Sequence, residues 1–252
     1  VAHFQFLKQA MRKGTAKFTM PSPAMLHARA DRASLEKVYP EVDELWADLT
    51  KAYREEIADL YQAGCRYLQI DDTTIAMWGD PKVQEHFRKL GDDPAKDAAM
   101  YADAVNAAIR EVPEDMTVAI HTCRGNFKST WLASGAYADF VAERVFTGLD
   151  VDAFFLEYDT ERAGGFEPLR FVPKGRRVVL GLVSTKTPVL EEKDFLRRRI
   201  DEAARFVPLE DLSISPQCGF ASHQKGTALA FADQEAKLRL VVETAREVWG
   251  SA

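Results

Sequence analysis

The stretch Thr117-Val-Ala-Ile-His-Thr-Cys-Arg-Gly-Asn-Phe127 decides the fold, because in it a buried strand runs directly into reactive side chains. Residues 117–120 form a β-branched, apolar run that is typical of such a strand. His121 and Cys123 follow at once, and Gly125 ends the strand. Since alternate residues of a strand point to the same side, the imidazole and the thiol are expected to project together. This pair makes up half of a metal site.

Working outward from this stretch, strands and helices alternate along the whole chain. The other expected strands are Lys17–Met20, Arg66–Ile70, Ala153–Leu156, Arg177–Val183 and Leu212–Ser215. The expected helices are Val1–Met11, Glu41–Ala63, Asp97–Glu111, Tyr137–Arg144, Lys193–Phe206 and Asp233–Trp249. Several strands are apolar on both faces, which indicates a parallel sheet covered by helices.

Two architectures fit this alternation, an open doubly wound sheet and a (β/α)8 TIM-type barrel. No glycine-rich phosphate loop follows any strand, which weakens the dinucleotide-binding version of the first. In a barrel, functional residues sit at the C-terminal ends of several strands. The expected strand ends carry Asp71, His121, Cys123, Glu157, Lys186 and Cys218. We therefore expect the barrel.

Only six strands are expected, whereas a complete barrel has eight. The chain also opens in what we expect to be the middle of a helix. The sequence thus predicts a single barrel domain over residues 1–252 that is N-terminally incomplete, with its first two strands before Val1. Open sheet edges would then favour association with a missing segment or a partner chain, so an oligomer is compatible with this expectation.

Composition narrows the function class. The 252 residues are 46% hydrophobic and 29% charged, which fits one globular domain with a substantial core. A net charge of −6 argues against nucleic acid or an anionic membrane as the main partner. No apolar run approaches the roughly 20 residues that a membrane span needs. Three cysteines, an odd number, indicate reduced thiols in a cytoplasmic protein.

Four residues at strand ends suit a borderline-soft metal: His121, Cys123, Glu157 and Cys218. Zinc takes imidazole nitrogen, thiolate sulfur and carboxylate oxygen in tetrahedral geometry, whereas thiolates disfavour magnesium and calcium. The spacing matches no zinc-finger pattern, so the site would be built at the mouth of the barrel. The alternative is that the cysteines are ordinary buried residues and that Glu157 is a solvated loop acid.

Charged residues beside this group are candidates for substrate binding. Asp71 and Asp72 are adjacent and point to opposite sides of an extended chain, so one can face the pocket while the other caps the next segment. A carboxylate at the mouth would bind a substrate ammonium or act as a general base. Lys186 would supply positive charge for an anionic substrate, the alternative being a solvated loop lysine.

The remaining aromatic, histidine and cysteine residues are interpreted as structural or peripheral. Core packing is expected for the aromatic residues that follow strand ends, Trp78, Phe127, Trp131 and Phe220. His3 and His86 are expected at the surface, and His223 beside the site. Cys65 precedes its strand and is expected to be structural at the opposite end of the barrel.

Taken together, five segments resemble the catalytic domain of cobalamin-independent methionine synthase and its shorter single-domain relatives. They are Gln69-Ile-Asp-Asp72, His121-Thr-Cys-Arg-Gly-Asn126, Phe155-Leu-Glu157, Gly181-Leu-Val-Ser-Thr-Lys-Thr-Pro188 and Ser215-Pro-Gln-Cys-Gly219. The resemblance runs along the whole chain in order. It implies a (β/α)8 barrel in which zinc holds the thiol of homocysteine as a thiolate that attacks a methyl group.

By this resemblance, His121, Cys123, Glu157 and Cys218 are the zinc ligands, and Asp71 holds the amino group of homocysteine. Asp72 is expected to be a further substrate contact. Lys186 stands where the full-length enzymes carry a histidine that is the suspected proton donor to the folate, so it is expected to be catalytic. The methyl donor is left open between a methylfolate and methylcobalamin.

Three alternatives remain beside homocysteine methylation. The first is a related zinc-dependent alkyl transfer to another thiol such as coenzyme M, in which Lys186 or Arg124 would bind a sulfonate. The second is a non-catalytic barrel with a structural zinc. The third is a metal-free barrel of the decarboxylase type, which leaves the histidine, cysteines and glutamate at strand ends unexplained.

Overall fold

The structure, a computed structural model, describes residues 1–89, 91–221, 224 and 226–251. Its strands are β1 (Lys17–Pro21), β2 (Tyr67–Asp72), β3 (Thr117–Thr122), β4 (Ala153–Glu157), β5 (Arg177–Val183) and β6 (Leu212–Pro216). Its α-helices are α1 (Ala2–Ala10), α2 (Pro23–Arg29), α3 (Arg32–Val38), α4 (Val42–Gln62), α5 (Thr74–Met77), α6 (Pro81–Lys89), α7 (Pro94–Ile109), α8 (Asp139–Gly148), α9 (Lys193–Ala203) and α10 (Phe231–Trp249). Short 3-10 turns η1 (Glu161–Ala163), η2 (Glu167–Phe171) and η3 (Leu209–Asp211) complete the set.

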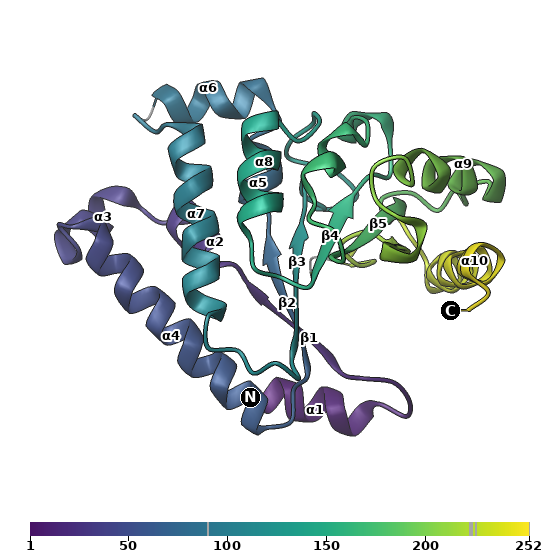
Figure 1. Cartoon of the computed structure of the whole chain (residues 1–252), viewed down its shortest axis with the longest axis horizontal. Helices are drawn as coiled ribbons and strands as arrows, with labels where there is room; N and C mark the ends of the chain where they lie inside the picture. Colours follow the sequence, from purple (N-terminus) through teal and green to yellow (C-terminus); the bar gives the residue numbers. More distant parts are fainter. Residues whose placement is uncertain (90, 222–223, 225, 252) are drawn as a thin grey trace.

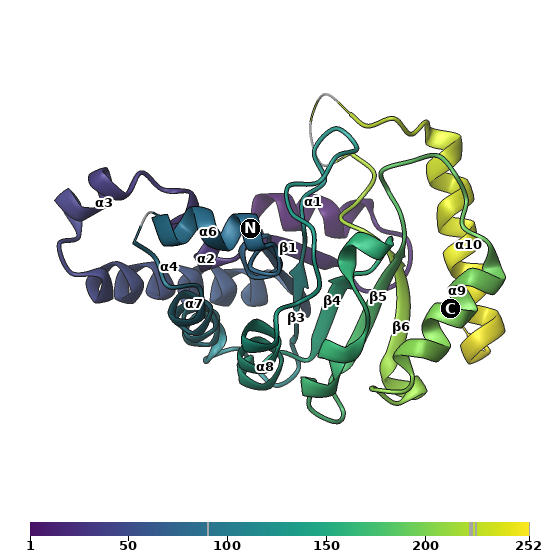
Figure 2. The ribbon, with the colours of Figure 1, turned by 90° about the horizontal axis from the view of Figure 1, so that it is seen from above.

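The six strands form one parallel sheet in the order β1-β2-β3-β4-β5-β6, so each strand pairs with the next strand along the chain. The carboxyl ends of the strands therefore meet at one edge of the sheet. Within the described part of the chain, β1 and β6 do not pair with each other, and the barrel is not closed. Figures 1 and 2 show the helices following one another around the sheet, with α9 and α10 beside β5 and β6.

Strand residues alternate between two environments. On β2, Leu68 and Ile70 are fully buried in the core beneath the helices, while Gln69 and Asp71 between and after them line a cavity. On β4, Phe154 belongs to the same core. The face toward the helices is therefore apolar, and the opposite face carries polar side chains. This period of two is what places chemistry on one side of the sheet.

The expected strands and long helices are confirmed, with ends shifted by a few residues. Four short helices were not predicted: α2, α3, α5 and α6. A signal for α2 was present, because Pro23 is its first residue and the Ser22 hydroxyl accepts a 3.0 Å hydrogen bond from the amide of Ala24. These helices lie in the connections that follow β1 and β2, where hydrophobic periodicity is too short to be read.

The aromatic residues that follow strand ends differ in burial. Trp78 is 1% exposed and packs in the core as predicted, whereas Phe127 is 46% and Trp131 52% exposed, so core packing is wrong for these two. Both lie on the loop after β3, which projects beyond the sheet. His3 and His86 are exposed and Cys65 is fully buried, as predicted, while His223 lies outside the described residues.

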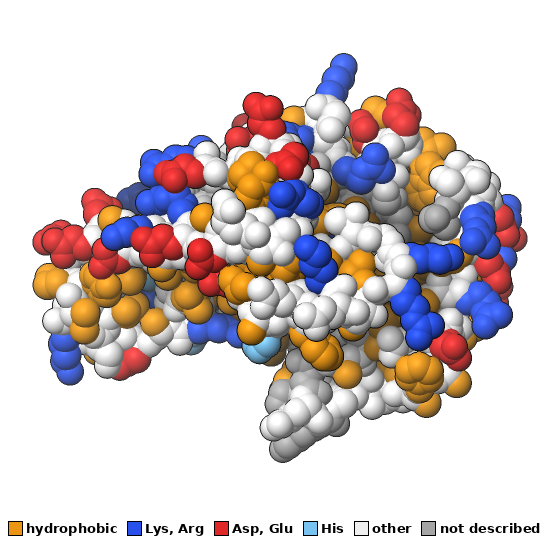
Figure 3. Space-filling view, turned by 90° about the horizontal axis from the view of Figure 1, so that it is seen from below, with side chains coloured by type: hydrophobic (Ala, Val, Ile, Leu, Met, Phe, Trp, Pro, Cys, Tyr) orange, Lys and Arg blue, Asp and Glu red, His pale blue; other side chains and the backbone are white. Residues whose placement is uncertain are grey.

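The surface mixes charges of both signs. On the face shown in Figure 3, acidic and basic side chains are interspersed, with hydrophobic side chains between them. Among the described helices, none combines the length and apolarity that crossing a membrane requires.

Candidate metal and substrate site

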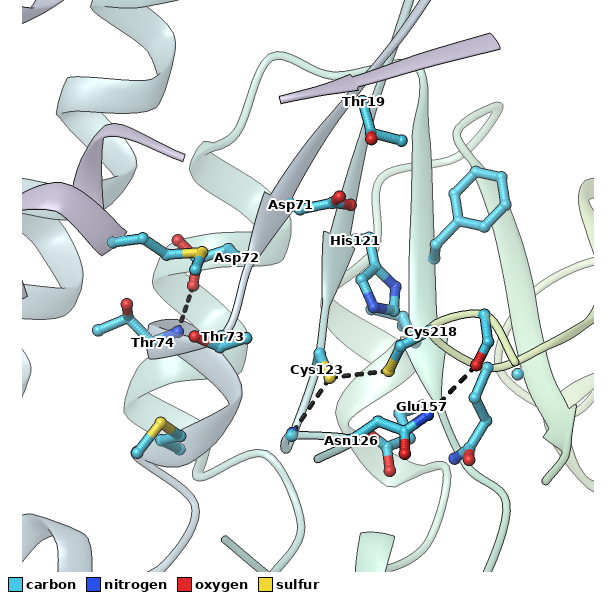
Figure 4. A pocket seen from close by; sticks show the side chains of 18 of the residues that line it. Thr19, Asp71, Asp72, Thr73, Thr74, His121, Cys123, Asn126, Glu157 and Cys218 are labelled. Atoms are coloured by element: carbon cyan, nitrogen blue, oxygen red, sulfur yellow. Dashed lines mark hydrogen bonds between the residues drawn. The ribbon is translucent and has the colours of Figure 1, made fainter. Parts of the chain in front are cut away.

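The carboxyl ends of the strands open into a cavity of about 970 Å³. Six of the predicted site residues line it: Asp71, Asp72, His121, Cys123, Glu157 and Cys218. They come from β2, β3, the loop that begins directly after β3, β4 and the loop after β6, and Figure 4 shows His121, Cys123 and Cys218 gathered at the centre of the site. The seventh, Lys186, lies behind Glu157 and contacts that carboxylate. The prediction that separate strand ends converge on one site is confirmed.

Two thiols and one imidazole form the core of the site. Cys123 Sγ lies 2.8 Å from Cys218 Sγ, and both cysteines are free. The hydrogen bond from the Cys218 thiol lowers the pKa of Cys123 well below its usual range, and the same contact raises the pKa of Cys218. The ligand atoms of these two cysteines and His121 all lie within 4.8 Å of one another.

The loop after β3 fixes the position of Cys123. The amide of Gly125 donates to Cys123 Sγ at 3.1 Å. Gly125 has φ +95, and a Cβ there would lie 2.9 Å from the backbone nitrogen of Leu132, so a side chain would be strained twice over. The amide of Asn126 donates to Thr185 Oγ1 at 3.0 Å and to the carbonyl of Gly219 at 3.2 Å. This one side chain ties together the loops after β3, β5 and β6.

The three ligand atoms fit a metal of zinc's preferences. Nε2 of His121 is buried and has no hydrogen-bond partner among the described residues. A buried, unpaired imidazole nitrogen facing two thiols is the donor set that zinc binds. Two sulfurs on tetrahedral zinc stand about 3.8 Å apart, given Zn–S of about 2.3 Å, so the thiols would separate by about 1 Å on binding. Cys218 is on the loop after β6, which can accommodate a shift of this size without moving a strand.

Glu157 is beside this group without belonging to it. Its carboxylate is 1% exposed and accepts from the amide of Arg124 at 2.8 Å. The other oxygen accepts from Lys186 at 3.1 Å and from Arg162. The reading of Glu157 as a solvated loop acid is therefore wrong, and its assignment as a fourth ligand stays a prediction.

Lys186 is buried and ion-paired. Its side chain is 4% exposed, and Nζ lies 3.1 Å from Glu157 Oε1 and 3.6 Å from Asp159 Oδ2. Nζ also donates to Gln217 Oε1 at 2.7 Å. Burial lowers the pKa of Lys186, and the charge of Asp159 opposes this. The alternative of a solvated loop lysine is wrong, because the charge is balanced inside the protein.

Sequence reasoning missed two members of this charge network. Arg162 donates to Asp159 Oδ1 at 2.9 Å as well as to Glu157, so two cations and two carboxylates share one buried space. Asp159 stands two residues after Glu157, and the period of two was a usable signal for it. Arg162 lies in η1, and nothing in the local sequence marks it.

The two adjacent aspartates divide their roles as predicted. Asp72 is fully buried, and its Oδ1 accepts from the amides of Thr74 and Ile75, each at 2.7 Å. Its Oδ2 accepts from the Ser22 hydroxyl at 2.5 Å. These contacts cap the segment after β2 and occupy both oxygens. Asp71 is half-buried and faces the cavity (Figure 4), so substrate binding is expected of it, while the expectation for Asp72 stays untested.

Comparison with known proteins gives a consistent result. Residues 31–247 match the model of the family described as cobalamin-independent synthase, catalytic domain. The chain is 46% identical over 249 residues to the uncharacterized protein YxjH of Bacillus subtilis, and the match covers 98% of this chain and 65% of that relative. The chain thus spans less than two thirds of that relative's length.

Solved structures agree with this match. A Listeria monocytogenes protein, assigned as a vitamin-B12 independent methionine synthase, superposes with TM-score 0.78 at 38% identity over 99% of this chain and 69% of its own. A B12-independent methionine synthase from Shewanella, solved with selenomethionine, superposes with TM-score 0.72 at 20% identity over 98% of this chain and 65% of its own. The second likeness concerns the fold alone. The fold class is therefore the TIM-type barrel, with the barrel not closed here.

Proposed function

This chain belongs to the cobalamin-independent synthase catalytic-domain family, and we propose that it carries zinc-dependent transfer of a methyl group to the thiol of homocysteine, forming methionine. The observation that carries the proposal is the group of His121, Cys123 and Cys218, which lines the substrate-sized cavity. Residues 1–252 would act as one catalytic domain. The donor would be a methylfolate or methylcobalamin.

The cysteines and the histidine would hold the zinc. Zinc, when bound, deprotonates a thiol whose ordinary pKa is about 8.5 and so supplies a nucleophilic sulfur at neutral pH. Glu157 would complete the protein ligands, or would stay with its present partners and leave that position for the substrate. Its existing contacts with Lys186 and Arg162 support either arrangement, because a carboxylate held by two cations can exchange one contact for another.

Asp71 would hold the amino group of homocysteine. It faces the same cavity as the thiols. Solvent weakens the attraction between an ammonium and a half-buried carboxylate less than the attraction between an ammonium and an exposed one. Holding the amino group fixes the direction of the thiol, which is the positioning that a displacement at sulfur needs. We propose that Lys186 donates a proton to the methyl donor, or stabilises negative charge on it, as its methyl group leaves.

The ion pairing of Lys186 with two carboxylates favours homocysteine over a sulfonate thiol such as coenzyme M. A sulfonate needs an unpaired cation, but Lys186 is already balanced by Glu157 and Asp159. Arg124 is fully buried and donates to the carbonyls of Gly135 and Glu157 at 2.9 Å each, so it too is committed within the protein. Asp71, by contrast, suits the ammonium that homocysteine carries and coenzyme M lacks.

Methionine formation tests the proposal. The zinc-loaded protein is incubated with homocysteine and either methyltetrahydrofolate or methylcobalamin, and methionine is measured by mass spectrometry. We expect product with one donor, and its loss on chelation or in Cys123→Ser, which removes one sulfur ligand. A matched control is Cys65→Ser, since Cys65 lies at the other end of β2. No product with either donor, or product that survives Cys123→Ser, would contradict the proposal.

A further inference from the structure

Three polar residues on neighbouring strands line the floor of the cavity beneath the metal ligands. Lys17 is on β1, Gln69 and Asp71 are on β2, and all three face the cavity. The strands run parallel, with Thr19 opposite Gln69, so Lys17 lies two residues further than Gln69 from the carboxyl edge of the sheet. Gln69 and Asp71 are two residues apart and therefore share a face. Each of these positions is fixed by the sheet rather than by a loop.

Two hydrogen bonds connect these three side chains in series. Lys17 Nζ donates to Gln69 Oε1 at 2.8 Å, and Gln69 Nε2 donates to Asp71 Oδ1 at 2.6 Å. A lysine ammonium has donors only, so the carbonyl end of the Gln69 amide must face Lys17. The NH₂ end must then face Asp71. Lys17 thereby determines that Gln69 presents a donor, and not an acceptor, to the Asp71 carboxylate.

Lys17 itself is held in place by aromatic rings. Its Nζ lies 4.0 Å from the ring centroid of Phe155 and 5.5 Å from that of Tyr67. Cation–π contacts of this kind favour a charged ammonium where water is partly excluded. Burial lowers the pKa of Lys17, and the negative charge of Asp71 opposes this. The ammonium is therefore positioned by two rings and one amide oxygen.

Asp71 differs from the other carboxylates of the site in its charge balance. Glu157 is ion-paired with Lys186 and Arg162, and Asp72 has both oxygens occupied by capping contacts. Among the described residues, the Asp71 carboxylate makes no ion pair, and its only hydrogen bond is the one from Gln69 Nε2 to Oδ1. The Gln69 amide thus orients the carboxylate without neutralising it, which leaves Oδ2 and the negative charge for a ligand.

We propose that Lys17 and Gln69 are positioning residues that aim the Asp71 carboxylate at the amino group of the thiol substrate, and that this arrangement makes the site selective for thiols that carry an α-amino group. The inference rests on the proposed function and names the residues behind its substrate preference. Neither Lys17 nor Gln69 touches the reacting sulfur. They act through Asp71.

Two thiols that differ only in the amino group provide the test. The affinities of homocysteine and of its des-amino analogue, 4-mercaptobutanoate, are measured by titration calorimetry with the zinc-loaded protein. The wild type should prefer homocysteine by about 10- to 100-fold, the value of one hydrogen bond to a charged group. Gln69→Glu replaces the donor with an acceptor of the same shape, and Lys17→Met frees the amide to turn. Both should bring the ratio of affinities to within about threefold, with 4-mercaptobutanoate bound as before.

Lys13→Met is the matched control, because it removes an exposed lysine outside the cavity and should leave the ratio unchanged. Retention of the wild-type ratio in Gln69→Glu and Lys17→Met would overturn the inference. An equal loss of affinity for both thiols would also overturn it, because the residues would then support the fold and not Asp71. A wild type without preference would overturn it as well. The same titrations after chelation test the proposed function separately. Affinities that do not change when zinc is removed would contradict thiol binding at the metal. The ratio of the two affinities would still test whether Lys17 and Gln69 position Asp71.

Discussion

Substituting Lys186 with methionine should destabilise the metal-free protein strongly. The change removes a 3.1 Å contact with Glu157, a 3.6 Å contact with Asp159 and a 2.7 Å hydrogen bond to Gln217, and it leaves two buried carboxylates with less positive charge. Removing one member of a buried ion pair costs about 3–5 kcal/mol. Because Arg162 still contacts both carboxylates, we expect the lower end, about 3 kcal/mol. For a domain of this size that corresponds to about 6 to 12 °C in Tm.

The assay is urea unfolding and a thermal scan of chelator-treated protein, followed by circular dichroism. Lys193→Met is the control, since Lys193 also contacts two acids, Glu243 at 2.7 Å and Glu247 at 3.0 Å, but at the surface, where solvent screens the charges. It should unfold close to the wild type. If Lys186→Met unfolds together with Lys193→Met, the buried charges do not depend on Lys186 and the reasoning about this network is refuted.

Three further predictions concern the metal ligands, the paired aspartates and His27. His121→Ala and Cys218→Ser should each lose bound zinc while the far-ultraviolet circular dichroism stays as in the wild type, and elemental analysis that finds stoichiometric zinc in either variant removes that residue from the ligand set. Asp72→Ala should lower the free energy of unfolding by about 2 kcal/mol, because two buried amides lose their acceptor. Asp71→Ala should change the free energy of unfolding much less. Urea titrations that rank the two variants the other way would contradict the division of roles between the two aspartates. Burial lowers the pKa of His27 to about 4 from 6.5, so the folded state favours the neutral ring. The free energy of unfolding of the wild type, relative to that of His27→Gln, should therefore fall as pH drops from about 6.5 to about 4. Unfolding curves whose difference is independent of pH would count against this burial.

The arrangement of the site could be predicted from sequence where the period of a strand carried the information. His121 and Cys123 are two residues apart at the end of an apolar run, and the cavity receives both. The same rule separated Asp71 from Asp72. The sequential strand order is that of a barrel, which the functional residues at the ends of several strands favoured over a doubly wound sheet. These features depend on local pattern alone.

The charge network behind Glu157 could not be predicted in the same way. Lys186 and Arg162 meet the carboxylates, and Gln217 meets Lys186, only because the loops after β4, β5 and β6 fold over one another. Loops have no periodicity, so a lysine in a loop reads as solvated until its partners are known. The exposure of Phe127 and Trp131 has the same origin, since the loop after β3 projects beyond the sheet.

Metal content with and without substrate tests the central claim most directly. Protein purified without chelators is analysed for zinc, and its zinc K-edge absorption is recorded before and after homocysteine is added. The account predicts about one zinc per chain, bound by two sulfurs from Cys123 and Cys218, with one further sulfur in the coordination shell after homocysteine is added. A protein that binds no zinc, or a zinc whose absorption does not change with homocysteine, would contradict it.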